Sequence, residues 1–212
     1  MSFDRLAPVY RALERVLAGD KLQRCRLAHL SQTRHARNAL LLGEGHGRFI
    51  IPLLYANPSV RVTCVDASAK MLVQTKRAIK RAGLDTARVE FVCTDIFDWR
   101  PTTHGFDLIS TNFFLDCFRA DQLAVLLPKL ASLATPDACW LVADFCTPGQ
   151  GLARLRAQAI LWSMYRFFRV MTLLPATRLT DCTGLLQQQG FKLTDRETFD
   201  WGLLRADCWQ RR

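Results

Sequence analysis

The stretch Ala39–Ile50, ALLLGEGHGRFI, decides the fold of this chain. It opens with four consecutive apolar residues, which end at the glycine-rich run Gly43-Glu44-Gly45-His46-Gly47. A short apolar run closed by turn-forming residues predicts a buried parallel strand, and the mixed segment after it predicts a helix beginning at Arg48. Glycines lack Cβ, so they can take positive φ and let a ligand lie against backbone amides. We therefore expect the first strand–turn–helix unit of a doubly wound sheet, where nucleotide-like cofactors bind.

The spacing of the glycines narrows the choice of cofactor. A dinucleotide fingerprint requires G-x-G-x-x-G, but Arg48 stands where the third glycine would be. The acid inside the turn also disfavours NAD, because a carboxylate repels a pyrophosphate. The pattern G-E-G-H-G resembles motif I of the class I S-adenosylmethionine-dependent methyltransferases. The resemblance implies that Glu44 handles the ammonium at the amino acid end of the cofactor. We expect a cofactor-side role for His46 because it lies within the glycine turn. The alternative is an ordinary tight turn.

An acid follows the second predicted strand. Val60–Val65 alternates and is β-branched, and Asp66 comes roughly 20 residues after the glycines, where a ribose diol needs a hydrogen-bond acceptor. Asp66 could instead cap the helix predicted over Ser68–Ala82. The segment VDASAKML also resembles the family pattern, which implies that Ala67 and Met71 lie beside the cofactor, Met71 near adenine.

A second acid follows the third predicted strand, Val89–Cys93. The resemblance implies an adenine site here, in which Asp95 accepts from the exocyclic amine and apolar side chains cover the ring. That site comprises Thr94, Asp95, Ile96 and Phe97. The alternative for Asp95 is the cap of a turn.

The fourth predicted strand, Phe106–Ser110, leads toward the reacting centre. In open α/β sheets the ligand lies at the carboxyl ends of strands where the strand order switches. We therefore expect Thr111 and Asn112 near the cofactor and Phe113 and Phe114 near the methyl acceptor, in a small apolar pocket with few polar groups. Core packing is the alternative for the phenylalanines. If the acceptor needs a base, the candidates are Asp116, Tyr10, Asp144 and His46. Asp144 could equally bond to a neighbouring loop.

The opening residues carry a second resemblance. The sequence FDRLAPVYRALE resembles the D-x-x-A-x-x-Y entry of the ubiquinone/menaquinone-type methyltransferases. That resemblance implies that Tyr10 helps to cover the cofactor or the substrate, whereas the alternative is a residue on the apolar face of a helix. Apolar residues recur near helical spacing through Ser2–Thr33, which predicts helices ahead of the first strand.

The segment from Phe145 to Thr180 contains arginines and large apolar residues but no acid. It could be a lid over the acceptor pocket, an ordinary sheet-covering helix, or a basic amphipathic helix on a membrane surface. We favour the lid, in which Tyr165 and Arg169 contact the acceptor. Two alternating segments, Phe191–Thr198 and Leu203–Gln210, then predict a closing β-hairpin.

Composition bounds the function further. The 212-residue chain has a net charge of +10, mostly from dispersed arginines, and no nucleic-acid-binding motif, so we expect no nucleic acid partner. We see no signal peptide and no apolar run of the ~18–20 residues that span a bilayer. The eight cysteines are scattered without a C-x-x-C pair, which predicts a reduced, cytoplasmic protein without a metal site.

The patterns predict one domain over residues 1–212, and its resemblance to the methyltransferases implies a seven-stranded, mostly parallel Rossmann-like methyltransferase sheet, its last strand antiparallel and helices on both faces. Its parts are an N-terminal helical cap (1–38), a cofactor-binding core (39–146), a helical lid or cover (147–190) and a terminal β-hairpin (191–212). The predicted function is methyl transfer from S-adenosylmethionine to a small apolar or aromatic acceptor. The alternatives are an NAD(P)-dependent oxidoreductase and a non-catalytic partner protein that binds the cofactor.

Overall fold

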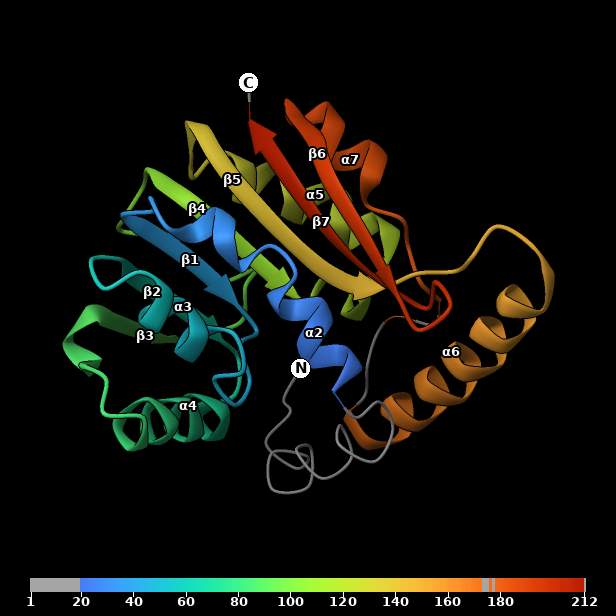
Figure 1. Cartoon of the computed structure of the whole chain (residues 1–212), viewed down its shortest axis with the longest axis horizontal. Coiled ribbons are helices and arrows are strands. Elements are labelled where there is room, and N and C mark those ends of the chain that lie inside the picture. Colours follow the sequence, from blue (N-terminus) through green and yellow to red (C-terminus); the bar gives the residue numbers. More distant parts are fainter. Residues whose placement is uncertain (1–19, 173–175, 177, 212) are drawn as a thin grey trace.

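The fold is built on a seven-stranded sheet with strand order β3-β2-β1-β4-β5-β7-β6 (Figure 1). The computed structural model describes residues 20–172, 176 and 178–211. The first five strands are parallel, and β7 is antiparallel to both of its neighbours, β5 and β6. The predicted fold class, including the antiparallel last strand, is confirmed. The strands are β1 (Asn38–Leu42), β2 (Arg61–Asp66), β3 (Val89–Cys93), β4 (Phe106–Asn112), β5 (Ala134–Phe145), β6 (Phe191–Phe199) and β7 (Leu204–Arg211).

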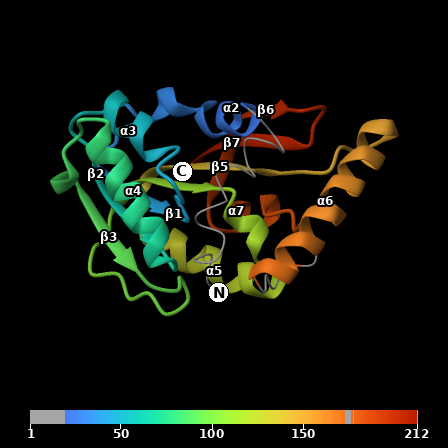
Figure 2. The same ribbon diagram turned by 90° about the horizontal axis from the view of Figure 1, so that it is seen from below.

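Helices cover both faces of the sheet (Figure 2). On one face lie α3 (Ile50–Ala56) and α4 (Ala69–Arg81). Helix α2 (Lys21–Leu27) and the short helix η1 (Leu30–Thr33) lie on the same face. On the other face lie α5 (Ala120–Ala131) and α7 (Thr183–Gln188). The remaining helices are η2 (Thr86–Arg88), η3 (Leu115–Cys117) and α6 (Gly151–Thr172).

Strand β1 lies between the two layers of helices, and the packing on its two faces explains why its buried residues are apolar. Ala39 and Leu41 pack into the cluster under α3 and α4, whereas Leu40 and Leu42 pack into the cluster under α5 and α7. Because both faces are covered, all four positions are apolar rather than alternating. The parallel strands on either side, β2 and β4, hold β1 in register and bring their carboxyl ends to the same edge.

Several element boundaries differ from those that the sequence predicts. β5 begins at Ala134, ahead of Pro136-Asp137, because its pairing with β4 jumps from Phe106↔Ala134 to Leu108↔Cys139 and so accommodates these two residues. Proline lacks an N–H and is tolerated in strands at such irregularities. β4 runs on to Asn112 instead of ending at Ser110. Helix α4 is capped by Ser68, whose Oγ accepts from the Met71 N–H at 3.2 Å, so Asp66 is not the cap.

Helix α6 projects beside the carboxyl end of β5 instead of lying across a sheet face (Figures 1 and 2). Its buried stripe of Ala157, Leu161 and Tyr165 packs in a cluster that includes residues of α2, β5 and β7. Its opposite side exposes large apolar residues, among them Leu152 and Trp162. The arrangement does not match the ordinary sheet-covering helix. None of the helices in the described ranges has the length and hydropathy needed to cross a membrane.

Candidate functional site

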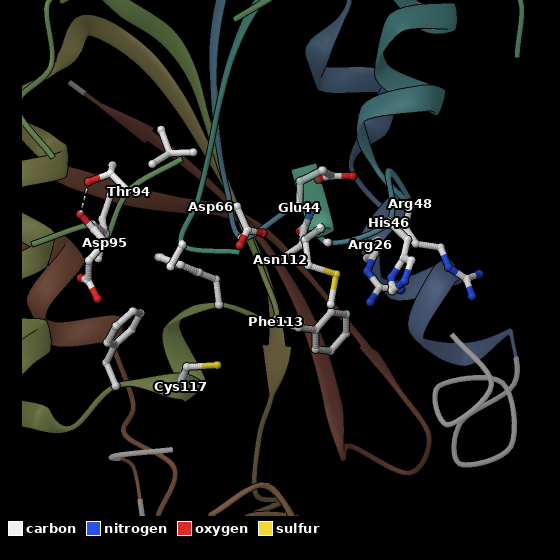
Figure 3. A pocket seen from close by; sticks show the side chains of 18 residues that line it. Arg26, Glu44, His46, Arg48, Asp66, Thr94, Asp95, Asn112, Phe113 and Cys117 are labelled. Carbon is white, nitrogen blue, oxygen red and sulfur yellow. Dashed lines mark hydrogen bonds between the residues drawn. The ribbon is translucent and has the colours of Figure 1, made fainter. Parts of the chain in front are cut away.

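An open cleft lies at the carboxyl ends of the parallel strands (Figure 3). Its walls come from the segments that follow β1, β2, β3 and β4, with one residue from α2. This is where the strand order switches between β1 and β4, the place that sequence reasoning assigns to a ligand. The lining residues are Arg26, Gly43, Glu44, Gly45, His46, Arg48, Val65, Asp66, Ala67, Met71, Thr94, Asp95, Ile96, Asn112, Phe113, Phe114, Cys117 and Phe118.

The glycine turn after β1 forms the floor of the cleft. Gly43, Gly45 and Gly47 have φ values of +63°, +64° and +80°, a region that side chains rarely adopt. A Cβ on Gly43 would lie 2.5 Å from the Phe114 ring, whereas a Cβ on Gly45 would have no heavy atom of the described residues within 4 Å. Gly43 is therefore required by packing, and Gly45 leaves its backbone open to the cleft. Thr75 of α4 fixes the turn, because its hydroxyl donates to the Gly45 carbonyl at 2.5 Å.

Glu44 occupies the junction between the turn and α3. One carboxylate oxygen, Oε1, accepts from the N–H groups of Phe49 and Ile50 at 2.7 and 2.8 Å, so the side chain caps the start of α3. Burial raises the pKa of Glu44 to about 7, against the lowering effects of those two hydrogen bonds and of the nearby Arg26. Because the carboxylate also lines the cleft, a ligand cation there would favour its ionised form.

Two further acids line the cleft beyond Glu44. Asp66 ends β2, and its Oδ1 accepts from the Ser68 N–H at 2.8 Å. The Thr94 N–H donates to the Asp66 carbonyl at 3.1 Å, which joins the ends of β2 and β3. Asp95 forms a turn in which its Oδ1 accepts from the Phe97 N–H at 3.1 Å, so it both caps a turn and faces the cleft. Figure 3 shows Asp66 between Glu44 on one side and Asp95 on the other.

Basic side chains gather at the Glu44 end of the cleft. Arg26, His46 and Arg48 lie together there, at the opposite end from Thr94 and Asp95 (Figure 3). The Arg26 guanidinium carbon lies 4.7 Å from the centre of the Phe113 ring. Sequence patterns did not indicate Arg26, because its place depends on the packing of α2 against β5, β6 and β7. Arg48 had a local signal, its position directly after the glycine turn, but we considered it only as the missing third glycine.

Two residues expected at the cofactor do not line the cleft, and they are withdrawn from the candidate site. Thr111 is fully buried, and its hydroxyl accepts from the Trp140 Nε1–H at 3.0 Å. The Phe97 ring packs edge-on against Phe118 with 5.7 Å between ring centres. Asn112 does line the cleft, with its amide donating to the Ser110 hydroxyl at 2.9 Å.

The phenylalanines after β4 form a wall of the cleft that adjoins the glycine turn, where the Phe114 ring lies against Gly43. Phe113 has a φ of +52°, and its N–H donates to the Ala143 carbonyl at 2.7 Å. Its ring packs edge-on against Phe145, and the Phe114 ring packs edge-on against Phe118. Both Phe113 and Phe114 line the cleft, as does Cys117, which we did not anticipate.

A group of buried titratable residues lies behind this wall. Asp144 accepts through Oδ2 from the Asp116 N–H at 3.1 Å, so of the two alternatives for Asp144 the bond to the neighbouring loop is the one observed. The Tyr165 hydroxyl donates to the Asp116 carbonyl at 3.1 Å and ties α6 to this loop. Burial raises the pKa of Asp116 to about 6, and burial with the nearby Asp116 charge raises the pKa of Asp144 well above its usual range.

These residues reach the cleft only indirectly. Asp116, Asp144 and Tyr165 do not line it, but Cys117 does, and the Cys117 Sγ lies 3.6 Å from Asp116 Oδ1. Arg169 is exposed on α6 and does not line the cleft either. Tyr10 lies outside the described residues.

Comparison with known proteins supports the geometry. The family model described as "Methyltransferase domain" matches residues 39–137, which include the glycine turn, Asp66 and Asp95. A search of curated protein sequences finds no match.

Solved methyltransferases share the fold along nearly the whole chain. Mitomycin 7-O-methyltransferase has a TM-score of 0.72 at 19% identity, over 100% of this chain and 61% of that one. A putative O-methyltransferase from Nostoc punctiforme has a TM-score of 0.74 at 18% identity, over 97% of this chain and 59% of that one. Magnesium protoporphyrin IX methyltransferase from Synechocystis was solved with bound S-adenosylhomocysteine. It has a TM-score of 0.65 at 17% identity, over 90% of this chain and 83% of that one.

At these identities the structural likeness concerns the fold, and the chain spans about three fifths of the length of the first two proteins. The strand order with β7 antiparallel beside β5, the glycine turn with acids after β2 and β3, and the family match agree with one another. Residues 39–137 match the methyltransferase domain family, and the chain shares the fold of solved methyltransferases.

Proposed function

We propose that this chain binds S-adenosylmethionine along the cleft and transfers its methyl group to a small, apolar or aromatic acceptor. The observation that carries the proposal is the order of side chains along one cleft. An acid among cations at one end is followed by Asp66 in the middle and by Asp95 with apolar neighbours at the other end. This order matches a ligand with an amino acid, a ribose and an adenine in series.

Each part of the cleft suits one part of that cofactor. Glu44 would hold the ammonium, and Arg26 and Arg48 the carboxylate, of the amino acid end. The Asp66 carboxylate would accept from the ribose hydroxyls. Asp95 would accept from the adenine amine, with Met71 and Ile96 covering the ring. The open backbone at Gly45 supports this fit, because a side chain there would fill the space that a ligand needs.

The chemistry of transfer needs little from the protein beyond positioning. The cofactor supplies an electrophilic methyl group on a sulfonium. The chain's residues then hold the acceptor in line and exclude water. Phe113 and Phe114 would form the apolar side of the acceptor pocket, with Tyr165 and Arg169 contributing from α6 as a lid. Tyr10 would take a proton from an acceptor hydroxyl, or Asp116 would do so from behind the cleft wall by way of the Cys117 thiol, with Asp144 holding the Asp116 backbone in place.

The structural neighbours indicate which acceptors to try first. Their names include a mitomycin, a magnesium protoporphyrin and a complex with apigenin, all ring systems that would fit beside phenylalanines. We expect label transfer from S-[methyl-³H]adenosylmethionine to at least one phenol, quinol or polycyclic aromatic, and none to nucleic acid. Cofactor binding without transfer to any acceptor in a panel that also holds lipids and small amines would favour the non-catalytic partner protein instead.

The role of Asp116 can be tested with its near-isostere. Asp116→Asn keeps the backbone bonds to Asp144 and Tyr165 but cannot accept a proton. We expect kcat for a phenolic acceptor to fall by ~10²–10⁴ with cofactor affinity unchanged, as for loss of a general base. In the wild type, kcat should fall as the pH drops below about 6, where the Asp116 carboxylate becomes protonated. An unchanged kcat and pH profile in the variant would remove Asp116 from the mechanism.

The variant Glu44→Gln separates the helix-capping role of the Glu44 side chain from the role of its negative charge. The glutamine carbonyl can still accept from Phe49 and Ile50, so the cap of α3 remains while the charge is lost. Because the folded pKa is raised to about 7, ionisation in the folded state costs stability as the pH rises from about 4.5 to 7. We expect the ligand-free variant to match the wild type at pH 4.5 and to exceed its free energy of unfolding by about 1–2 kcal/mol at pH 8, since water in the cleft reduces the full effect.

The affinity for the cofactor should change with pH in the opposite sense to the stability. If Glu44 holds the ammonium, the affinity of the wild type for S-adenosylhomocysteine falls as the pH drops below about 7, and Glu44→Gln binds ~10-fold more weakly at pH 8 without that pH dependence. Arg26 and Asp66 also act on the charge of Glu44 and are present in both proteins, so the comparison isolates Glu44. Calorimetry from pH 5.5 to 8.5 checks this. Equal affinities at every pH would leave Glu44 as a helix cap alone.

A further inference from the structure

Away from the cleft, three side chains of metal-ligand type converge near the free edge of the sheet. His29 is the N-cap of η1, and Asp195 and Glu197 stand two residues apart on the edge strand β6. One ligand atom from each lies within 4.8 Å of the other two. We infer that these residues form a binding site for a divalent transition-metal ion such as Zn²⁺.

The hydrogen bonding of His29 turns Nδ1, the nitrogen that would ligate, toward the two carboxylates. The ring is 5% exposed, and its Nε2 lies 3.1 Å from the Ala206 carbonyl oxygen. A carbonyl oxygen only accepts, so Nε2 carries the hydrogen and Nδ1 is the nitrogen that faces the carboxylates. Metal-bound histidines commonly donate their other ring N–H to a backbone carbonyl in this way, which fixes the tautomer and the ring orientation.

The spacing also suits a bridging ion. Nδ1 of His29 lies 3.6 Å from Oδ2 of Asp195, longer than the ~2.7–3.2 Å of an N–H···O hydrogen bond. Two ligand atoms that each lie ~2.0–2.1 Å from a tetrahedral Zn²⁺ are about 3.3 Å apart. A small adjustment of the exposed Asp195 side chain would bring the pair to that distance.

The negative charge of the two carboxylates in the cluster favours the binding of a cation. Within the described residues, neither Asp195 nor Glu197 has a salt bridge to lysine or arginine, although the chain carries a net charge of +10. The intervening Arg196 is paired instead with the buried Asp207, at 2.6 and 2.8 Å. Two carboxylates therefore share one imidazole, and a divalent ion would neutralise them.

The ligand set favours some metals over others. One imidazole and two carboxylates suit Zn²⁺, Co²⁺ or Fe²⁺, whereas Mg²⁺ and Ca²⁺ prefer oxygen ligands alone. The ion would join η1, which directly follows α2, to the edge strand β6. Since α2 carries Arg26 into the cofactor cleft, the ion would also steady that wall of the cleft.

The test uses the full chain after removal of metals by a chelator. Calorimetric titration with Zn²⁺ alone should show one equivalent bound with micromolar affinity, and Co²⁺ should give the visible absorption of a low-symmetry nitrogen–oxygen site. Asp195→Asn/Glu197→Gln should weaken Zn²⁺ binding at least ~100-fold and abolish the Co²⁺ spectrum. Both substituted side chains are exposed, so this variant is expected to fold as the wild type does.

Matched controls identify the ligands. Asp98→Asn/Asp137→Asn removes two other exposed acids and should leave Zn²⁺ binding unchanged. Zn²⁺ binding that survives Asp195→Asn/Glu197→Gln, or a Co²⁺ spectrum with thiolate charge-transfer bands, would assign the metal to cysteines and overturn the proposal. No Zn²⁺ binding by the wild type below ~100 µM would overturn it as well.

Discussion

Asp66→Ala is expected to raise the Kd for S-adenosylhomocysteine by roughly 100-fold or more. The proposed carboxylate accepts from both ribose hydroxyls, and each hydrogen bond to a charged group contributes about 1.5–3 kcal/mol. Loss of both therefore exceeds the effect expected at any other single side chain of the cleft. Calorimetric titration of the two proteins under identical conditions measures the change.

A structural explanation for that loss must be kept apart from a direct one. Asp66 Oδ1 also accepts from the Ser68 N–H, and Ser68 caps α4, so alanine could disturb the cleft without any contact to ribose. Asp66→Asn keeps an oxygen for Ser68 and removes the charge, and we expect it to weaken binding by ~10–100-fold with an unchanged thermal midpoint. Asp98→Asn, an exposed acid outside the cleft, should bind as the wild type does. Wild-type affinity in Asp66→Asn would contradict the ribose assignment.

Alanine at Gly45 and at Gly43 should give opposite outcomes. Both glycines have φ near +63°, so either substitution strains the backbone by about 1–2 kcal/mol. At Gly43 the new Cβ also meets the Phe114 ring at 2.5 Å, which adds about 1–3 kcal/mol of overpacking. At Gly45 it meets no described atom within 4 Å. We therefore expect Gly43→Ala to lose mainly stability and Gly45→Ala to lose mainly cofactor affinity.

The expected magnitudes make the comparison decisive. Gly43→Ala should lower the free energy of unfolding by about 2–5 kcal/mol, and Gly45→Ala by only about 1–2 kcal/mol. Gly45→Ala should raise the Kd for S-adenosylhomocysteine at least ~30-fold, because a methyl group displaces a ligand that lies against the backbone. Urea unfolding and calorimetry on both variants test this. Tight binding by Gly45→Ala would mean that the ligand does not approach the turn.

The parts of the site that the sequence could predict are those carried by local patterns. The glycine turn, Asp66 and Asp95 each follow a strand whose apolar or β-branched residues are visible in the sequence, and all line one cleft. Parallel strands bring their carboxyl ends to one edge, so residues far apart in the chain could be placed together from sequence patterns alone. The antiparallel last strand came from the family resemblance rather than from periodicity.

The predictions for site residues were wrong or incomplete where a strand boundary, or a contact between distant parts of the chain, decides where a side chain lies. Thr111 was expected at the cofactor because β4 was predicted to end at Ser110, but the strand continues to Asn112 and its side chains keep alternating. Ser110 and Asn112 therefore share a face, and Thr111 points the other way, onto Trp140. Arg26 and Thr75 reach the cleft through packing between elements, and no pattern within the sequence encodes those contacts.

The most direct test of the account is calorimetric titration of the purified protein with S-adenosylhomocysteine and, separately, with NADH. The order of Glu44, Asp66 and Asp95 along one cleft predicts micromolar binding of S-adenosylhomocysteine and no measurable binding of NADH. Tight binding of NADH without a response to S-adenosylhomocysteine would contradict both the cofactor assignment and the interpretation of the glycine turn.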